Sequence, residues 1–391
     1  MLHIKCFRTR AEVEAIAKQW DEIVRRSWNN SFFMTWTWLS HWLDVYLDDH
    51  SLLCLGVYDD ENLVALAPFW VETRRQWGVG RLKILRFIGS EEACPDHMDL
   101  IIPKSHTYGI SRLIWDELYG SLRKEWDIWS YEYVPADSHV FHNIHLLAES
   151  DDRCLGLVLR DYTICLYVDL PDSWDKFFAS FNSKQRRNIR EPVEVAQKLG
   201  PLELRFCERP EEVPQFLQIL IDLHEKSWQE RGAAGSFASP RFSRFHHELA
   251  ASLVGKKQLF LCSLELSGRP IAAFYGFVYN KAVHFYLPGI DRGAVPGASV
   301  IKILLTQCLE AAIQRGCTRF DFLRGFEEYK YAWTDTEQRE LAMTIYNRSF
   351  AALLCIFHGY VNRFSKQAGK LFLGGQTARI KRWLGKGQRA H

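Results

Sequence analysis

Apolar and polar residues follow one another along this chain in a pattern that predicts strands and helices in turn. Residues 52–67, LLCLGVYDDENLVALA, place two apolar runs around a polar turn, and residues 260–274, FLCSLELSGRPIAAF, repeat that arrangement. Apolar runs of this length on both sides of a short polar turn are typical of β-hairpins. Segments with helical spacing follow in both regions. We therefore expect an α/β fold with a mixed sheet.

The elements that follow the two hairpins also match. In each half we expect a further strand, a loop, a helix and a last strand. The pairs are the strands Leu82–Ile88 and Ala282–Leu287, the helices Tyr108–Lys124 and Ser299–Gly316, and the strands Asp127–Tyr133 and Thr318–Leu323. The shared order and hydrophobic register predict a duplicated unit. We expect units at residues 1–155 and 156–345, followed by a tail at residues 346–391.

Helical segments open the second unit. Ser173 is suited to cap a helix that begins WDKFFASF. The segment 183–200, SKQRRNIREPVEVAQKLG, carries three close arginines, and Pro192 is expected to interrupt its helix. Residues 214–232 and 239–256 also show helical spacing.

The distribution of charge is more informative than its sum. The formal net charge of +2 excludes a strongly basic polyanion binder by composition. No acidic residue follows Glu340, while lysines and arginines alternate with apolar residues to the end of the chain. This basic amphipathic tail could dock on its own domain with a solvated basic side. It could instead rest on an anionic membrane face or a polyanionic partner.

Cysteine usage and the apolar runs predict a cytoplasmic protein. The ten cysteines are scattered singly without a CxxC pair, the N-terminus does not read as a signal peptide, and no apolar run approaches the ~20 residues of a membrane span. The segment 94–100, CPDHMDL, offers Cys94, Asp96, His97 and Asp99, but this spacing fits no standard site. We therefore predict no metal.

A glycine-rich loop precedes the second-unit helix. Residues 288–305 read PGIDRGAVPGASVIKILL, with glycines that leave the backbone open and Ser299 placed to cap the helix. Free N–H groups at a helix N-terminus favour a phosphate or diphosphate group. Neither a Walker motif nor a GxGxxG fingerprint is present, so nucleotide hydrolysis and dinucleotide binding are disfavoured.

An acid and a group of aromatic and ionisable residues mark the last strand of the second unit. Residues 320–333 read FDFLRGFEEYKYAW, with Asp321 inside an apolar run. Strand ends and helix N-termini meet at one cleft in such folds, so this segment is expected to line the cleft. The matching segment of the first unit, residues 127–140, lacks the Tyr-Lys pair. We expect the first unit to be structural.

The order of these motifs resembles one known family. The runs FDFLRGFEEYK, YLPGIDRGAVPGASVIKILL, LSGRPIAAFYGF, FFMTWTWLSHWLDVY and NSKQRRNIRE are similar to the CelD-like acetyltransferase family. Genes of that family are commonly associated with bacterial cellulose and exopolysaccharide production. It belongs to the GNAT superfamily of acyl-CoA-dependent N-acyltransferases and is similar in its doubled plan to Fem-type aminoacyl transferases. The resemblance covers nearly the whole chain.

The resemblance implies a site. The diphosphate of acetyl-CoA or another acyl-CoA would lie on the amides of Gly297, Ala298, Ser299 and Val300. Roles for the other residues follow from the same resemblance: Tyr329 would protonate the departing thiolate, Glu327 or Glu328 would act as base, Asp321 would orient the amine, and Lys330, Trp333 and Arg187 would contact substrate. This sequence departs from the family at one position. Phe326 stands where the family usually has an acid directly after the glycine, which weakens the assignment of a catalytic base to position 326.

Three hypotheses on function follow. The leading one is an acyl-CoA-dependent N-acyltransferase acting on the amine of a small metabolite or an amino sugar, linked to exopolysaccharide or cellulose production. The second is a Fem-type transferase that takes an aminoacyl group from tRNA, and it alone would require nucleic acid. The third is a non-catalytic module of polysaccharide assembly that contacts the membrane through its basic tail.

Overall fold

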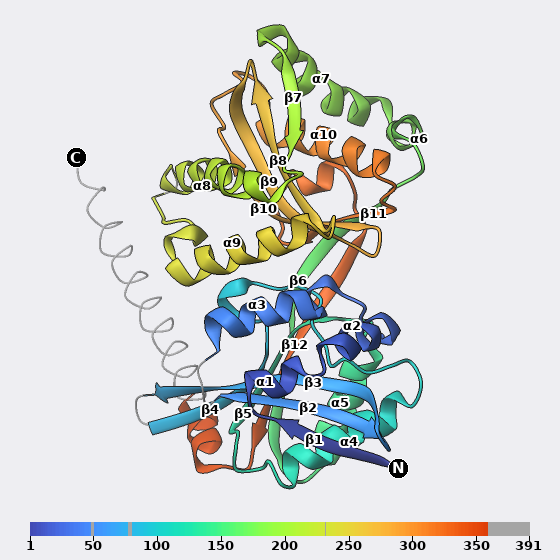
Figure 1. Ribbon diagram of the computed structural model, residues 1–391, viewed down its shortest axis with the longest axis vertical. Helices are drawn as coiled ribbons and strands as arrows, with labels where there is room; N and C mark the ends of the chain where they lie inside the picture. The colour runs from blue at the N-terminus through green and yellow to red at the C-terminus, as the bar shows by residue number, and fades with distance from the viewer. Residues whose placement is uncertain (48–50, 77–79, 231, 359–391) are drawn as a thin grey trace, which may run out of the picture.

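The computed structural model describes residues 1–47, 51–76, 80–230 and 232–358 (Figure 1). The first half of the chain forms five strands and the helices between them, and then a long strand that continues into the second half. In chain order they are β1 (Leu2–Phe7), α1 (Arg10–Glu14), α2 (Ala17–Arg26), η1 (Phe32–Met34), α3 (Trp36–Tyr46), β2 (Leu52–Asp59), β3 (Asn62–Gln76), β4 (Gly80–Phe87), η2 (Glu91–Ala93), α4 (Thr107–Tyr119), β5 (Ile128–Pro135), α5 (His139–Ser150) and β6 (Cys154–Asp169).

The second half repeats this series after two helices. Its elements are α6 (Trp174–Ala179), α7 (Ser183–Leu199), β7 (Leu202–Phe206), η3 (Pro210–Glu212), α8 (Val213–Gln229), η4 (Ser236–Ala238), α9 (Pro240–Val254), β8 (Leu259–Leu266), β9 (Arg269–Tyr279), β10 (Ala282–Ile290), α10 (Val300–Gln314), β11 (Arg319–Arg324), η5 (Lys330–Ala332) and β12 (Glu337–Asn347). The paired hairpins, strands and helices expected from the hydrophobic pattern are all present.

The described strands form one mixed sheet. Their order is β1-β2-β3-β4-β5-β12-β6-β11-β10-β9-β8-β7. The β4–β5 and β10–β11 pairs are parallel, and the other neighbours are antiparallel. The α/β fold with a mixed sheet and two units of the same plan is thus confirmed. We call β1–β5 with β12 the N-terminal unit, and β7–β11 with β6 the C-terminal unit.

The two units exchange their last strands. β6 comes from the first half of the chain but pairs with β11, and β12 comes from the second half but pairs with β5. The two exchanged strands also pair with each other, from Glu337 opposite Leu166 to Asn347 opposite Cys154. In Figure 1 they run side by side between the two units. The predicted duplication does not account for the positions of β6 and β12 in the sheet.

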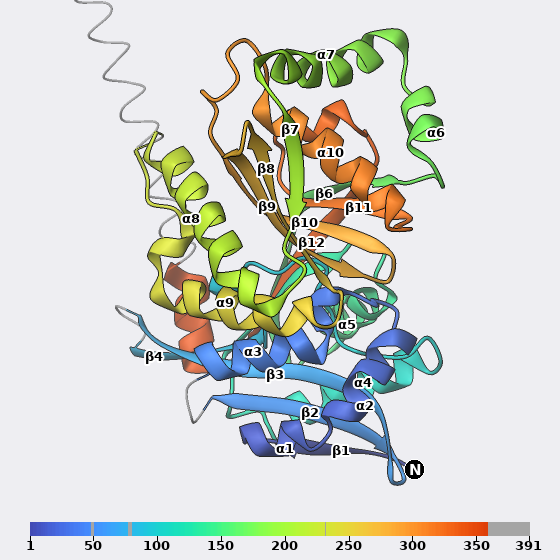
Figure 2. The same cartoon turned by 45° about the horizontal axis from the view of Figure 1, so that its top comes forward.

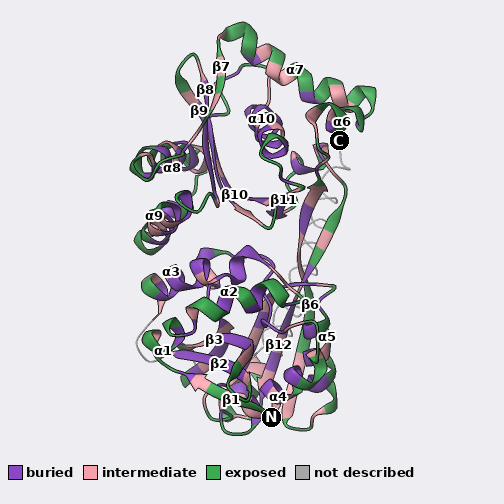
Figure 3. Cartoon of the chain, turned by 45° about the vertical axis from the view of Figure 1, so that its right-hand side comes forward, coloured by how far each residue is buried: buried purple, intermediate pink, exposed green. Residues whose placement is uncertain are grey.

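Helices cover both faces of the C-terminal sheet. Figure 2 shows α8 and α9 on one face and α10 with α6 and α7 on the other. α10 is apolar nearly all round, from Val300 to Ile313, because it lies between the sheet and α7. On the other face, α9 meets α3 of the N-terminal unit, where the rings of Trp38 and Phe245 lie 4.9 Å apart. Figure 3 shows the buried residues gathered along the strands and the inner sides of the helices.

Of two expectations about helices α6 and α7, one is confirmed and the other is wrong. Ser173 caps α6 as expected, since its side chain accepts the N–H of Lys176. The expectation that Pro192 interrupts the next helix is wrong, because α7 runs unbroken from Ser183 to Leu199. The carbonyl that loses its partner there belongs to the exposed residue Asn188, so water can solvate it.

The basic tail lies mostly outside the described residues, which end at residue 358. Both readings of it, docking on its own domain or contact with an anionic surface, therefore stay predictions. In the part of the chain that the structure describes, no helix is both long enough and apolar enough to cross a bilayer.

Candidate active site

β10 and β11 separate partway along their length. They pair only from Ala282 opposite Arg319 to His284 opposite Asp321, and the β9–β10 register shifts between His284 and Leu287. Beyond this point a cavity of 230 Å³ lies between the strands, lined by residues 285–288 of β10 and 322–324 of β11. The edge of β10 beyond His284 makes no ladder with β11, so its backbone groups could bind an extended ligand.

A backbone kink shapes this opening. Leu323 has a φ of 55°, a conformation that is rare for a non-glycine residue. The carboxylate of Asp321 stabilises the kink by accepting the N–H of Leu323 at 2.8 Å. Tyr133, at the matching position of β5, has a φ of 66°. The same distortion in both units supports a common origin of their plan.

The N-terminus of α10 has no side-chain cap. Ser299 occupies the N-cap position, but its side chain makes no cap hydrogen bond, so the expectation that it would cap the helix is wrong. Gly297 has a φ of +77° and is exposed. An uncapped first turn leaves N–H groups and the positive end of the helix dipole available to an anion.

A buried aspartate fixes the loop before α10. Asp291 accepts from Lys226 at 2.9 Å and Arg269 at 3.0 Å, and its other oxygen accepts the N–H of Gly293 at 3.2 Å. Lys226 keeps the pKa of Asp291 below its ordinary value, against the effect of burial. The sequence pattern did not single out this anchor, because its two cations come from α8 and β9.

The turn after β11 brings Glu327, Tyr329 and Lys330 to the wall of this cavity. Lys330 is only 2% exposed, and its Nζ donates to the carbonyls of Arg324 at 2.6 Å and Leu323 at 3.3 Å. The same ammonium pairs with Glu327 at 2.9 Å. Lys330 therefore holds the turn that presents Glu327, whose side chain is 52% exposed, and Tyr329.

Asp321 lies at a different cavity. This second cavity, of 470 Å³, lies between the two units, and His97, His284 and Asp321 line it. Oδ2 of Asp321 is 2.9 Å from Nε2 of His97. Burial alone would raise the pKa of Asp321, but His97 lowers it. Burial alone would lower the pKa of His97, but Asp321 and Glu340 raise it well above its ordinary value.

Two expected substrate residues lie apart from the others. Arg187 is on α7 with a side chain that is 76% exposed, and it pairs with Glu191 of its own helix at 3.3 Å. Trp333 is 3% exposed and packs against Phe181, with 6.3 Å between ring centroids. It lines a separate cavity beside α6. The structure thus groups Glu327, Tyr329 and Lys330 but not Arg187 or Trp333.

The N-terminal unit fills the corresponding gap with its own loop. β4 and β5 pair only at Ile84 and Leu85, and beyond this the N–H of Met98 donates to the carbonyl of Tyr133 at 2.7 Å. Asp99 of the same loop accepts from the hydroxyls of Tyr131 and Ser138, and burial raises the pKa of Asp99 to about 6. These contacts fill the gap of the first unit, and the expectation that this unit is structural stays a prediction.

That loop also forms part of the C-terminal cavity, a contribution that sequence reasoning missed. Cys94 and Asp96 line it. Asp96 accepts from Nε of Arg324 at 2.5 Å and from its backbone N–H at 3.1 Å. Burial raises the pKa of Asp96 to about 6, although Arg324 opposes this shift.

The gap between β10 and β11, with an uncapped helix after the glycine-rich loop, can be compared with known proteins. Residues 183–331 match the family model described as an acetyltransferase (GNAT) domain. The matched segment contains both strands of the gap, the α10 N-terminus and Glu327 to Lys330.

Solved structures share the fold. The chain is similar to the crystal structure of FemX, with a TM-score of 0.56 and 10% identity, over 85% of this chain and 96% of that chain. It is also similar to the C-terminal DUF2156 domain of an Agrobacterium fabrum protein, with a TM-score of 0.51 and 13% identity, over 89% of this chain and 95% of that chain. No curated protein matches. At these identities the likeness concerns the fold alone.

Proposed function

We propose that this chain is an acyl-CoA-dependent N-acyltransferase whose donor site lies in the C-terminal unit. The observation that carries the proposal is the gap between β10 and β11. One wall of the gap runs through β10 directly into the loop that opens α10, and the other carries Glu327 and Tyr329. The match of residues 183–331 to the GNAT acetyltransferase domain supports the same chemistry.

The residues present fit an acyl-CoA. The amides of Gly297, Ser299 and Val300 stand at the start of a helix whose first turn lacks a side-chain cap, which suits a diphosphate. The amide of Ala298, also expected there, donates to the carbonyl of Val295 at 3.2 Å. The backbone edge of β10 beyond residue 284 makes no ladder with β11, which suits an extended, amide-bearing arm, while the carbonyls of Leu323 and Arg324 on β11 accept from Lys330. In the N-terminal unit the backbone N–H of Met98 occupies the carbonyl of Tyr133 within the gap, although the N-terminus of α4 also lacks a side-chain cap.

The reaction would join an amine to the acyl carbon and release a thiol. Glu327 would take a proton from the substrate ammonium, directly or through water, and so free the amine to attack, and Tyr329 would donate a proton to the departing thiolate. Lys330 would keep both residues at the cavity through its contacts with the backbone. Asp321 as the group that orients the amine, and Lys330, Arg187 and Trp333 as substrate contacts, stay predictions.

The arginines of α7 do not favour the tRNA-dependent alternative. Arg187 and Arg190 pair with glutamates one turn on, at 3.3 and 3.0 Å. Arg186 donates to the carbonyls of Ala179 and Phe181. A surface for a polyanion needs cations without acidic neighbours, so α7 is better explained as a solvated helix.

Replacing Tyr329 by Phe tests the proton donor. We expect kcat to fall about 10²- to 10⁴-fold while KM for the donor changes little, because only the hydroxyl that meets the thiolate is removed. The measurement is thiol release from acetyl-CoA with an amine found by screening amino sugars and small amines. Tyr331→Phe is the matched control, since Tyr331 is exposed and does not line this cavity. Full activity in Tyr329→Phe would contradict the assignment.

Titration calorimetry with acetyl-CoA and free CoA tests the donor class itself. The proposal predicts binding of both to the full chain, with a stoichiometry of one. Absence of binding for both at millimolar concentration would exclude an acyl-CoA donor.

A further inference from the structure

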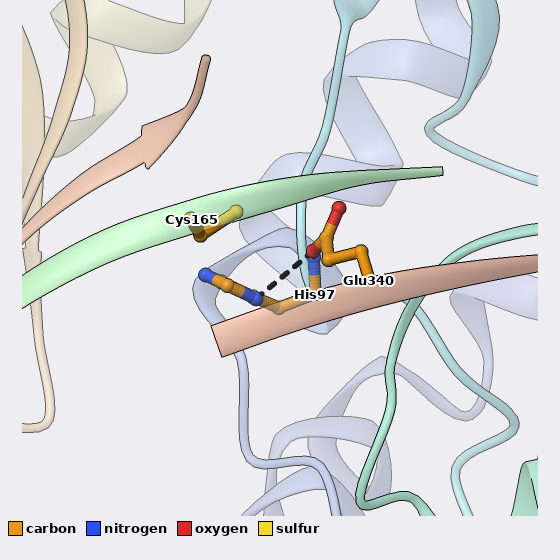
Figure 4. Close-up of side chains that lie close together, drawn as sticks. All are labelled: His97, Cys165 and Glu340. Carbon is orange, nitrogen blue, oxygen red and sulfur yellow. Dashed lines mark hydrogen bonds and ion pairs between the residues drawn. The ribbon is translucent and has the colours of Figure 1, made fainter. Parts of the chain in front are cut away.

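Three buried side chains from distant segments meet where the exchanged strands pair. They are His97 from the loop after β4, Cys165 from β6 and Glu340 from β12 (Figure 4). One ligand atom from each lies within 4.8 Å of the others. Their exposed fractions are 6%, 1% and 0%. A nitrogen, a sulfur and a carboxylate oxygen are thus gathered away from water.

Two polar atoms of this cluster lack hydrogen bonds. Nδ1 of His97 and Oε2 of Glu340 are buried and make no hydrogen bond among the described residues. Nδ1 lies 3.0 Å from Oε1 of Glu340 as an ion pair, without hydrogen-bond geometry. Buried polar atoms are nearly always satisfied, so these two point to a group that would satisfy them.

Neighbouring groups hold the histidine and the glutamate in place. Nε2 of His97 is 2.9 Å from Oδ2 of Asp321, and the backbone N–H of His97 donates to Oε1 of Glu340 at 2.6 Å. A histidine that binds a metal through one nitrogen commonly donates its other N–H to a carboxylate. The Asp321–His97 pair has this form, so Asp321 would be a positioning residue.

We propose that His97, Cys165 and Glu340 bind a zinc ion at the junction of the two units. Zinc accepts this mixture of imidazole, thiolate and carboxylate at about 2.0–2.3 Å, so the three side chains would move inward by a small amount. Binding would release the Cys165 proton and one imidazole proton, and the added dication would balance both losses. Sequence spacing predicts no metal, because Cys165 and Glu340 lie far from His97 along the chain.

The site has an approach from solvent. His97 lines the 470 Å³ cavity between the units, so an ion could enter there and a water could complete a four-coordinate site. The three ligands come from the N-terminal unit's loop and from both exchanged strands. Bound zinc would therefore tie together segments that the strand exchange already joins, and it would raise the thermal midpoint of the full chain.

Metal analysis and cobalt spectroscopy test the proposal on the full chain. We expect about one zinc per chain after growth with added zinc. Replacing the zinc with cobalt should give a thiolate-to-cobalt absorption band. Cys165→Ala should lose both the band and the metal. Cys54→Ala should keep them, since it removes an equally buried thiol from β2.

A further variant separates a metal site from a buried ion pair. Asp321→Asn should weaken zinc binding about 10- to 100-fold in competition with a chromophoric chelator. Wild-type chain that takes up neither zinc nor cobalt, or a bound cobalt without a thiolate band, would overturn the proposal, and this outcome does not depend on how Cys165→Ala folds. Zinc binding unchanged in Cys165→Ala would also overturn it. None of these readouts involves acyl transfer, so they are independent of the proposed activity.

Discussion

A chain that ends at Thr336, before β12, is expected to lose the fold of both units. β12 pairs with β5 of the N-terminal unit and with β6, which itself pairs with β11. Its removal exposes the partners of Met343 and Ile345, whose burial contributes roughly 1.5–3 kcal/mol each. Each lost ladder hydrogen bond adds about 1 kcal/mol. The sum is comparable to the roughly 5–15 kcal/mol that stabilises a domain.

Thermal unfolding followed by circular dichroism checks this expectation. The matched control ends at Arg348, which keeps β12 but removes the helix that follows it. We expect cooperative unfolding in the control and no cooperative transition in the shorter chain. If the chain ending at Thr336 melted like the control, the exchanged strands would not join the two units energetically.

Gly297→Glu is expected to weaken acetyl-CoA binding by about 100-fold or more. The new carboxylate would stand where the diphosphate meets the positive end of α10, so it would add like-charge repulsion of roughly 1–4 kcal/mol and compete for the same amides. A factor of 100 corresponds to about 2.7 kcal/mol. Calorimetry with acetyl-CoA measures the change.

Gly316→Glu is the matched control for this variant. Gly316 lies just beyond the other end of α10 and has a φ of +75°, against +77° for Gly297. Neither site has a heavy atom within 4 Å of an added Cβ, so both variants carry similar backbone strain and the same charge. We expect Gly316→Glu to bind like wild type. Equal loss of affinity in both variants would show that strain, and not the anion site, is responsible.

The parts of the fold that depend on local pattern could be predicted from the sequence. The hairpins and α10 follow from apolar spacing and turn residues within one short segment. The exchange of β6 and β12 could not be predicted, because an alternating strand pattern does not identify the strand with which it pairs. β12 reaches β5 across about two hundred residues of chain, and nothing in EQRELAMTIYN distinguishes that edge from the edge of its own half.

The same distinction between local and distant contacts applies to the candidate site. Glu327, Tyr329 and Lys330 fall within one turn, so their shared cavity follows from their closeness in sequence. Asp321 was expected beside them, but it contacts His97 at the cavity between the units. Trp333 turns into the core after η5, and Arg187 lies on the exposed side of α7. Asp96 was missed as part of the site because its partner Arg324 is distant in sequence.

Hydrogen–deuterium exchange with and without acetyl-CoA tests most directly whether the C-terminal unit holds the donor. The account predicts slower exchange on binding in residues 285–300 and 322–330, which line the gap between β10 and β11 and open α10. Residues 84–92, 98–107 and 128–135, which belong to the matching segments of the N-terminal unit and do not line this cavity, should exchange as before. Protection of those N-terminal segments, with none in the C-terminal ones, would contradict the account.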